Sequence, residues 1–183
     1  MSTEHLILGS IRDFITGEVI PDTHDERARQ KIARLLVDDK GFSKEDVDVR
    51  RKIPLKVDGT AATVTVDFVL QVREVLFALI IFGPGSLVSR ERPALAAARL
   101  LDPYVIPYAV VTNGQDAELL ETATGTVVAE GLAGIPSKDQ AEAWMQGFTL
   151  GRLSESRLEK ERRILFAFDV LAEKECDEYT CRL

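Results

Sequence analysis

Asp67 is the residue of this sequence best placed to do chemistry, because it lies in the middle of a strand-like stretch, VTVDFVL. A carboxylate can take up a proton, accept hydrogen bonds or bind a divalent cation, whereas an acid in a strand with no such role usually pairs with a basic neighbour. The next stretch, Val75 to Phe82, is wholly apolar, and no acid or lysine occurs from Val75 to Ser89. The sequence thus offers one acid here and no charged partner in the following strand.

A second acid, Glu26, lies at the start of a helix-like stretch. Thr23 and Glu26 have the spacing of a capping box, in which each side chain accepts a hydrogen bond from the backbone N–H of the other residue. Glu26 is therefore either the third residue of this cap or a second carboxylate that its helix brings over the sheet.

Basic side chains are the candidates for contacting nucleic acid. The best basic cluster lies within residues 50–56, but strand alternation divides it between two faces, and a charged edge strand protected against aggregation explains it as well. A later helix begins with two further arginines, and an Asn-Gly pair either forms a turn or ends a strand at a contact surface. The candidate contacts are Arg50, Arg51, Arg90, Arg92 and Asn113.

The elements that position these residues follow a definite order. Apolar residues at helical spacing predict a helix over 23–38, and alternation predicts two strands over 47–57 and 62–72, joined by an Asp-Gly turn. Residues 5–20 are expected to form short edge strands or an extended arm. The later patterns predict a strand over 75–82, a helix over 90–101 capped by Ser89, a strand over 106–112 and a hairpin over 117–122 and 126–130. This order predicts an α/β fold with an α-β-β-β-α-β core, a mixed sheet and flanking helices.

The C-terminal part of the chain is expected to be helical. Ser137 with Gln140 predicts a helix over 138–145, and Ser156 with Glu159 predicts a longer helix to about residue 175. The stretch from Ile164 to Ala172 is apolar nearly all round, so it must be buried, either on the core or on a partner such as a second copy of the chain. These patterns predict an N-terminal arm over 1–22, a core over 23–132 and a helical appendage over 133–183.

Composition limits the classes of protein to consider. The 183 residues are 45% hydrophobic and 29% charged, as in an ordinary soluble domain, and the net charge of −7 argues against general affinity for nucleic acid. The longest apolar run is too short to span a membrane, and the N-terminus does not resemble a signal peptide, so we expect a cytoplasmic protein. Cys176 and Cys181 cannot complete a zinc site within one chain and are interpreted as surface thiols.

Several motifs together resemble the N-terminal nuclease domain of type I restriction enzyme R subunits, in the PD-(D/E)xK superfamily. The motifs are DERARQKIARLLVDDKGF, VDVRRKIPLKVDG, VTVDFVL and PYVIPYAVVTNGQDAELL, and the resemblance covers residues 22–120. ERARQ and VVTNG are its most specific parts. The chain has no room for a helicase motor, so it is similar to a small stand-alone relative.

The resemblance implies metal-binding and catalytic roles for two acids. Glu26 matches the acid of the first helix, Asp67 matches the metal-binding acid of the strand, and Asn113-Gly114 matches the pair at the end of a later strand. The E-x-K motif of the family should fall near Leu79 to Phe82, where this sequence has only apolar residues. An apolar floor raises the cost of holding a divalent ion, so we expect no cofactor, or Mg²⁺ if the domain is active.

Three hypotheses follow for the function. The first is a catalytically degenerate nuclease-fold domain that binds nucleic acid or a partner protein. The second is an active Mg²⁺-dependent DNA endonuclease with a relocated site, in which an arginine of the helix over 90–101 replaces the lysine as a cation although it is a poor base. The third is a non-enzymatic scaffold protein that associates with itself through its C-terminal helix.

Overall fold

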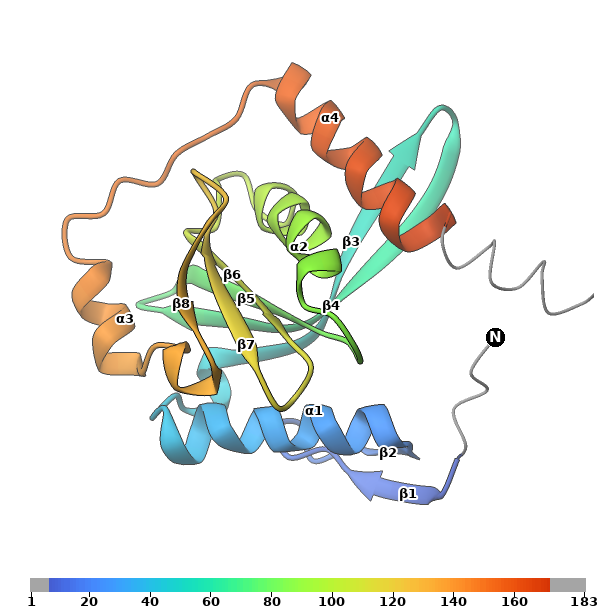
Figure 1. Ribbon diagram of the computed structural model, residues 1–183, viewed down its shortest axis with the longest axis vertical. Coiled ribbons are helices and arrows are strands. Elements are labelled where there is room, and N and C mark those ends of the chain that lie inside the picture. The colour runs from blue at the N-terminus through green and yellow to red at the C-terminus, as the bar shows by residue number, and fades with distance from the viewer. Residues whose placement is uncertain (1–6, 172–183) are drawn as a thin grey trace, which may run out of the picture.

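A six-stranded mixed sheet forms the centre of the computed structural model, which describes residues 7–171 (Figure 1). The strands lie side by side in the order in which they occur along the chain. Neighbouring strands are antiparallel except β5 and β6, which are parallel and are connected through a helix, α2. The strands are β3 (Val47–Val57), β4 (Thr60–Val72), β5 (Val75–Phe82), β6 (Tyr108–Thr112), β7 (Ala117–Glu121) and β8 (Thr126–Glu130).

The first three strands form a meander with two-residue turns. Asp58 and Gly59 have φ angles of 48° and 84°, and Arg73 and Glu74 have φ angles of 51° and 66°. Two consecutive left-handed residues are the geometry that matches the twist of an antiparallel hairpin. The tight links expected from the sequence are therefore present at both turns.

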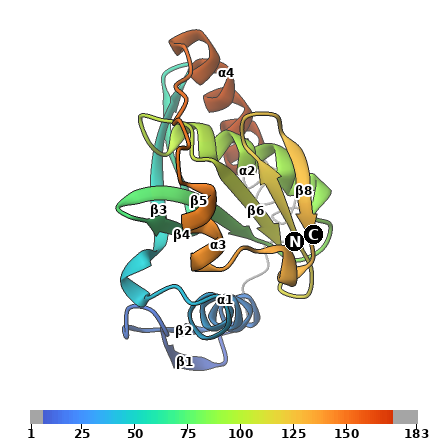
Figure 2. The ribbon, with the colours of Figure 1, turned by 90° about the vertical axis from the view of Figure 1, so that its left-hand side faces the viewer.

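Helices cover both faces of the sheet (Figures 1 and 2). One face carries α1 (His24–Arg34), which continues as a π-helical turn over Leu35–Asp39, and the hairpin of β1 (Gly9–Arg12) and β2 (Val19–Asp22) lies beyond it. The other face carries α2 (Val88–Leu100) and α4 (Glu155–Leu165), which is followed by a π-helical turn over Phe166–Leu171. The short helix α3 (Lys138–Trp144) contributes Ala141 to the core on the α1 side.

The core has one hydrophobic cluster on each face of the sheet. Phe42, Phe77 and Leu119 are buried in the cluster under α1, and Leu79 and Leu165 are buried in the cluster under α2 and α4. The buried side chains of α2 are mostly alanines, which allow a helix to lie close to the sheet on one side and to α4 on the other. The chain is long enough to bury a real core, as its composition predicts.

The β3–β4 hairpin changes the face that it buries halfway along its length. Near the start of β3, Val47 packs in the α1 cluster together with Phe68 of β4, whereas Ile53 and Val66 pack in the α2 cluster. Val47 and Ile53 are an even number of residues apart in β3, as are Val66 and Phe68 in β4, so in a regular strand each pair would point to the same face. The hairpin must therefore rotate between them. The rotation falls where Arg50 lies level with Asp67, and Arg50 has a left-handed φ of 55°.

The structure confirms the predicted α/β fold class and the α-β-β-β-α-β order from α1 to β6. Several boundaries differ by one or two residues. Among them, α2 begins at Val88 with Ser89 inside it, β4 begins at Thr60, β6 begins at Tyr108, and the residue before α4 is Ser154 instead of Ser156. Residue type alone favoured those serines as caps, whereas the packing of α2 and α4 decides where each helix begins.

The apolar C-terminal stretch is only partly buried on the core. Leu165 is fully buried and Phe166 is 8% exposed, but Phe168 is 47% exposed. Cys176, Cys181 and the end of the predicted helix lie outside the described residues. The division at residues 22 and 132 stays a prediction. Within residues 7–171, no helix is long and apolar enough to cross a membrane.

Candidate functional site

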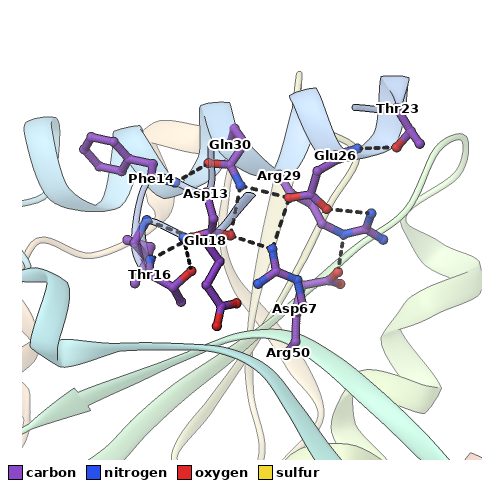
Figure 3. Close-up of polar contacts among 11 residues, drawn as sticks. Asp13, Phe14, Thr16, Glu18, Thr23, Glu26, Arg29, Gln30, Arg50 and Asp67 are labelled. Carbon is purple, nitrogen blue, oxygen red and sulfur yellow. Dashed lines mark hydrogen bonds and ion pairs between the residues drawn. The ribbon is translucent and has the colours of Figure 1, made fainter. Parts of the chain in front are cut away.

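Asp67 lies in β4 at the point where the hairpin rotates, and both of its oxygens have partners. Oδ1 accepts a hydrogen bond from Arg29 Nε at 2.5 Å (Figure 3), and Oδ2 accepts one from the backbone N–H of Phe82 in β5 at 2.7 Å. The side chain is 12% exposed. Asp67 therefore joins α1 to β5 and does not present an unoccupied oxygen to the solvent.

Glu26 lies in the first turn of α1, and its carboxylate points to the sheet (Figure 3). Thr23 caps the helix by accepting a hydrogen bond from the Glu26 N–H at 3.1 Å, which is half of the predicted capping box. The Glu26 carboxylate instead accepts hydrogen bonds from Gln30 Nε2 at 2.8 Å and from Arg50 Nη2 at 3.5 Å. Its other oxygen lies 3.8 Å from Arg29 Nη1, so Arg29 links the two acids.

Arg50 lies across from Asp67 in β3 and binds acids from two other elements. Its Nη2 donates to Asp13 Oδ2 at 2.5 Å and to Glu26 Oε1. Asp13 belongs to the turn between β1 and β2, where its Oδ1 also accepts hydrogen bonds from the N–H groups of Ile15 and Thr16. Burial raises the pKa of Asp13, but the hydrogen bonds from Thr16 and Arg50 outweigh burial, so the pKa lies below its usual value of 3.8.

The two acids line one cleft of about 640 Å³ between α1, the β3–β4 hairpin, the start of α2 and the π-helical turn after α4, which adds a third acid, Asp169. Arginines share its wall with these acids, from α1, β3 and α2 respectively: Arg29, Arg50 and Arg90. The structure thus brings together both predicted metal-binding acids and two of the predicted nucleic-acid contacts.

Strand β5 supplies the part of the cleft where the resemblance places E-x-K. Phe68 pairs with Ile80, so Asp67 lies level with Ile81, whose side chain lines the cleft. Leu79 is fully buried in the core, and the ring of Phe82 lies 5.2 Å from the Arg29 guanidinium carbon, in a cation–π contact. Apolar side chains therefore occupy the E-x-K positions in space as well as in sequence.

Arg90 occupies the space next to the end of β5. A Cβ atom added at Gly83 would collide with the Arg90 guanidinium, so any side chain at residue 83 would displace it. Arg90 also donates from Nη1 to the carbonyl of Ser86 at 3.1 Å. The Arg90 guanidinium therefore occupies the space into which a side chain at residue 83, just after the end of β5, would project.

The donor set fits a divalent cation poorly. Mg²⁺ takes about six oxygen ligands, and the cleft is lined by Glu26 and Asp67, each already paired with an arginine, and by Asp169 of the π-helical turn after α4. Among residues 7–171, no group of three or more acids, histidines or cysteines is arranged to hold a metal ion. No chemical step at this site is therefore assigned to a metal.

Three predicted nucleic-acid contacts lie away from the wall of the cleft. Arg51 is exposed and pairs with Asp48 at 3.0 Å, and Arg92 is exposed on α2. Asn113 forms the turn after β6, because its Oδ1 accepts hydrogen bonds from the N–H groups of residues 115 and 116. Its Nδ2 also donates to Gly85 at 3.3 Å, so the turn reading of Asn113 has direct support.

Three residues of the network were not predicted from the sequence: Asp13, Arg29 and Gln30. Gln30 is 6% exposed, donates to both Asp13 and Glu26, and accepts a hydrogen bond from the N–H of Phe14. Helical spacing could have found two of them, since Arg29 and Gln30 are three and four residues after Glu26. Asp13 had no such signal, because only the tertiary fold brings its turn to Arg50.

Comparison with known protein families gives a match over much of the chain. A family model described as the type I restriction enzyme R protein N terminus matches residues 24–136, which is more than half of the chain. The matched range begins at α1 and ends after β8, so it includes Glu26, Asp67 and every strand of the sheet. Neither a curated protein nor a solved structure gave a match.

Proposed function

The chain belongs to the family of type I restriction enzyme R protein N termini, and on that premise we propose that it is a nuclease-fold domain that binds nucleic acid without cleaving it. One observation carries the proposal: Asp67 and Glu26 converge on a single cleft, but arginines hold both of them and β5 supplies no further acid. The missing acid and lysine are the groups that would complete a metal site and orient the attacking water.

Loss of cleavage follows from the charges in the cleft. A divalent ion would have to displace Arg29 from Asp67 and Arg50 from Glu26, and each displaced guanidinium would stay within a few ångströms of the ion. Ile81 and Phe82 offer no oxygen ligand in exchange. The same side chains that once suited a metal site thus support a stable ion-pair network.

Binding to nucleic acid rests on the arginines at the cleft. Arg29 and Arg50 pair with Asp67 and Glu26, which weakens the repulsion of phosphate by these carboxylates. Arg90 adds a third cation to a wall that also carries a third acid, Asp169, so the positive charge of the arginines is balanced within the cleft. The exposed side chains of Arg51 and Lys52 extend the basic surface along β3, the edge strand. With a net charge of −7, contacts must be few and local, so we expect weak affinity with a shallow salt dependence.

Fluorescence anisotropy with labelled duplex and single-stranded DNA tests this binding at low and moderate salt. We expect Arg90→Ala to weaken binding. It should also lower the slope of log affinity against log salt concentration by about one. Arg73→Ala is the matched control, because Arg73 lies at the β4–β5 turn and pairs with Glu142. Binding without salt dependence, or equal binding by Arg90→Ala and the unchanged protein, would rule out the nucleic-acid function.

The position of Arg90 favours a second candidate, an active endonuclease with a relocated cation. Its guanidinium lies next to Gly83, two residues beyond Ile81, the residue level with Asp67, and just after the stretch from Leu79 to Phe82 where the resemblance places E-x-K. Plasmid nicking with Mg²⁺ or Mn²⁺, lost in Asp67→Ala, would support cleavage. Intact plasmid with either ion would exclude it and leave the first proposal in place.

The exposure of Phe168 favours a third candidate, self-association through the segment after α4. Phe168 is 47% exposed next to core residues Leu165 and Phe166. Sedimentation velocity of the full chain would detect a dimer, and Phe168→Ser should weaken it. A monomer at all concentrations would exclude this function.

A further inference from the structure

A second cavity, of about 390 Å³, lies at the other end of the sheet from the Asp67 cleft. Its wall is formed by α2, by the residues just before β6 and after β7, and by the segment that connects α3 to α4. Figure 1 shows that segment in orange, running from α3 to the start of α4. A hydrogen bond from Val105 N to Gly151 O, at 2.9 Å, fixes it to the chain before β6. The cavity shares no lining residue with the Asp67 cleft and has the volume of a small-molecule site.

Three guanidinium groups line this cavity, from Arg99, Arg152 and Arg157. Arg99 is 6% exposed, and it donates to Thr122 O at 2.7 Å and to Glu161 Oε1 at 3.2 Å. Arg157 donates to the same Glu161 oxygen at 2.9 Å. Among residues 7–171, Glu121 in the wall and Glu161 behind it are the acids at this cavity, so the described residues leave an excess of one positive charge.

The electrostatic balance around Arg99 supports a site for an anion. Burial lowers the pKa of Arg99, Glu161 raises it, and the positive charges of Arg157 and Arg92 lower it again. Like charges this close to a buried guanidinium are unfavourable unless a further anion accompanies them. The side chains of Arg152 and Arg157 are exposed or partly exposed, so their N–H groups are available to donate hydrogen bonds to an anion in the cavity.

Unsatisfied polar atoms mark the same wall. Thr122 lines the cavity, is fully buried, and its Oγ1 has no hydrogen-bond partner among the described residues. Glu161 Oε2, behind Arg99, also has none there. Buried polar groups without partners are rare in native proteins, and a bound polar ligand or water is a common reason for them.

The rest of the wall is apolar and includes one aromatic ring. Phe148 is 41% exposed in the segment between α3 and α4, and Val105, Pro107 and Leu153 complete the apolar surface. A ring that is half exposed next to arginines can stack on a planar group. The cavity therefore combines a surface for a flat apolar body with a cluster of donors for an anionic group.

From these observations we propose that this cavity binds a small planar aromatic compound carrying a phosphate or carboxylate. The ring stacks on Phe148, and the anionic group accepts hydrogen bonds from Arg152 and Arg157, with Arg99 and Glu161 holding Arg157 in place. This site does not depend on the proposed nucleic-acid function, because it lies at the opposite end of the sheet and uses other residues.

Isothermal titration of the full chain with two probes, adenosine monophosphate and phenyl phosphate, tests the proposal. We expect at least one probe to bind with one-to-one stoichiometry, and adenosine and inorganic phosphate to bind about tenfold more weakly than the monophosphate. Arg152→Ala should weaken the binding of the probe about tenfold, as expected for one charge-assisted hydrogen bond. Phe148→Ala should weaken it by a similar factor through lost stacking.

Arg163→Ala is the control, since Arg163 is an exposed arginine of α4 outside the cavity that pairs with Asp58. Phe148 is 41% exposed and Arg152 is also exposed, so we expect both variants to fold. Their unfolding midpoints would verify this. Absence of binding by both probes, or equal affinity in Arg152→Ala and Arg163→Ala, would overturn the proposal. If inorganic phosphate bound as tightly as adenosine monophosphate and Phe148→Ala had no effect, the proposed stacking of a ring on Phe148 would be wrong.

Discussion

Arg29 donates from Nε to Oδ1 of Asp67 at 2.5 Å, so the acid in the position of a family metal ligand holds an arginine. The contact joins α1 to β4, two elements that are 38 residues apart in the chain. The same guanidinium lies near Glu26 and on the ring of Phe82, so a single side chain contacts both candidate acids and the end of β5. These contacts form a structural junction between helix and sheet.

Arg29→Met should reveal how much the ion pair stabilises this junction. Methionine keeps the apolar stem but leaves Asp67, 12% exposed, without its cation, so we expect a loss of about 1–3 kcal/mol in the free energy of unfolding. With Asp67 released, Mn²⁺ should stabilise the variant more than it stabilises the unchanged protein. Urea unfolding with and without Mn²⁺ measures both effects.

Arg51→Met is the matched control, because Arg51 pairs with Asp48 on the exposed edge and should cost less than about 1 kcal/mol. A variant of Arg29 that is as stable as this control would contradict the junction role.

At residue 50, the glycine and alanine variants should rank in stability in the opposite order to that at an ordinary strand position. Its φ of 55° is left-handed, so glycine should fit the backbone better than alanine, and Arg50→Gly should be more stable than Arg50→Ala by about 1 kcal/mol. Both variants lose the bonds to Asp13 and Glu26, so their difference isolates the backbone.

Lys52, two residues along in β3, provides the comparison because it is exposed and pairs regularly with Thr65. There alanine should be more stable than glycine. Thermal unfolding of the four variants would decide, and the same order at both positions would contradict a strained Arg50.

Local patterns predicted most of the sheet and little of the network at its centre. Alternation and turn residues gave β3, β5 and β8 to the residue, because period and turn chemistry are properties of neighbouring residues. The choice of Glu26 and Asp67 as candidate ligands came from the family resemblance, and whether the two acids share one cleft was left open by every local pattern. Arg29 and Asp13 were not foreseen, since the rotation of the hairpin at Arg50 sets which side chains meet, and that rotation is a tertiary property.

Glu118 should make the stability fall as the pH rises. Burial raises its pKa above the usual 4.5, and the negative charges of Glu91, Glu130 and Asp116 raise it further. The folded protein thus binds a proton more tightly than the unfolded chain does. The resulting stabilisation is complete below 4.5 and is lost as the pH rises through the folded-state pKa.

Glu118→Gln should therefore raise the unfolding midpoint at neutral pH and flatten the dependence of stability on pH above 4.5. Glu45→Gln serves as the control, since Glu45 is exposed on the turn before β3. Denaturation curves from pH 4 to pH 8 would measure both variants. A Glu118→Gln curve parallel to that of the unchanged protein would refute the prediction.

At the buried pair of Arg99 and Glu161, removing one partner should lower the free energy of unfolding more than replacing both partners with apolar residues. Glu161 is fully buried and binds both Arg99 and Arg157, so Glu161→Ala leaves a buried guanidinium uncompensated and should cost about 3–5 kcal/mol. The double variant Arg99→Met with Glu161→Leu removes both charges and should recover most of that loss, because apolar side chains of similar size replace a buried pair at little cost. Arg163→Ala, which breaks an exposed pair on the same helix, should cost less than about 1 kcal/mol. Urea unfolding of the three variants gives the order, and a double variant less stable than Glu161→Ala would mean that α4 is held on α2 by the ion pair itself and not by the surrounding apolar contacts.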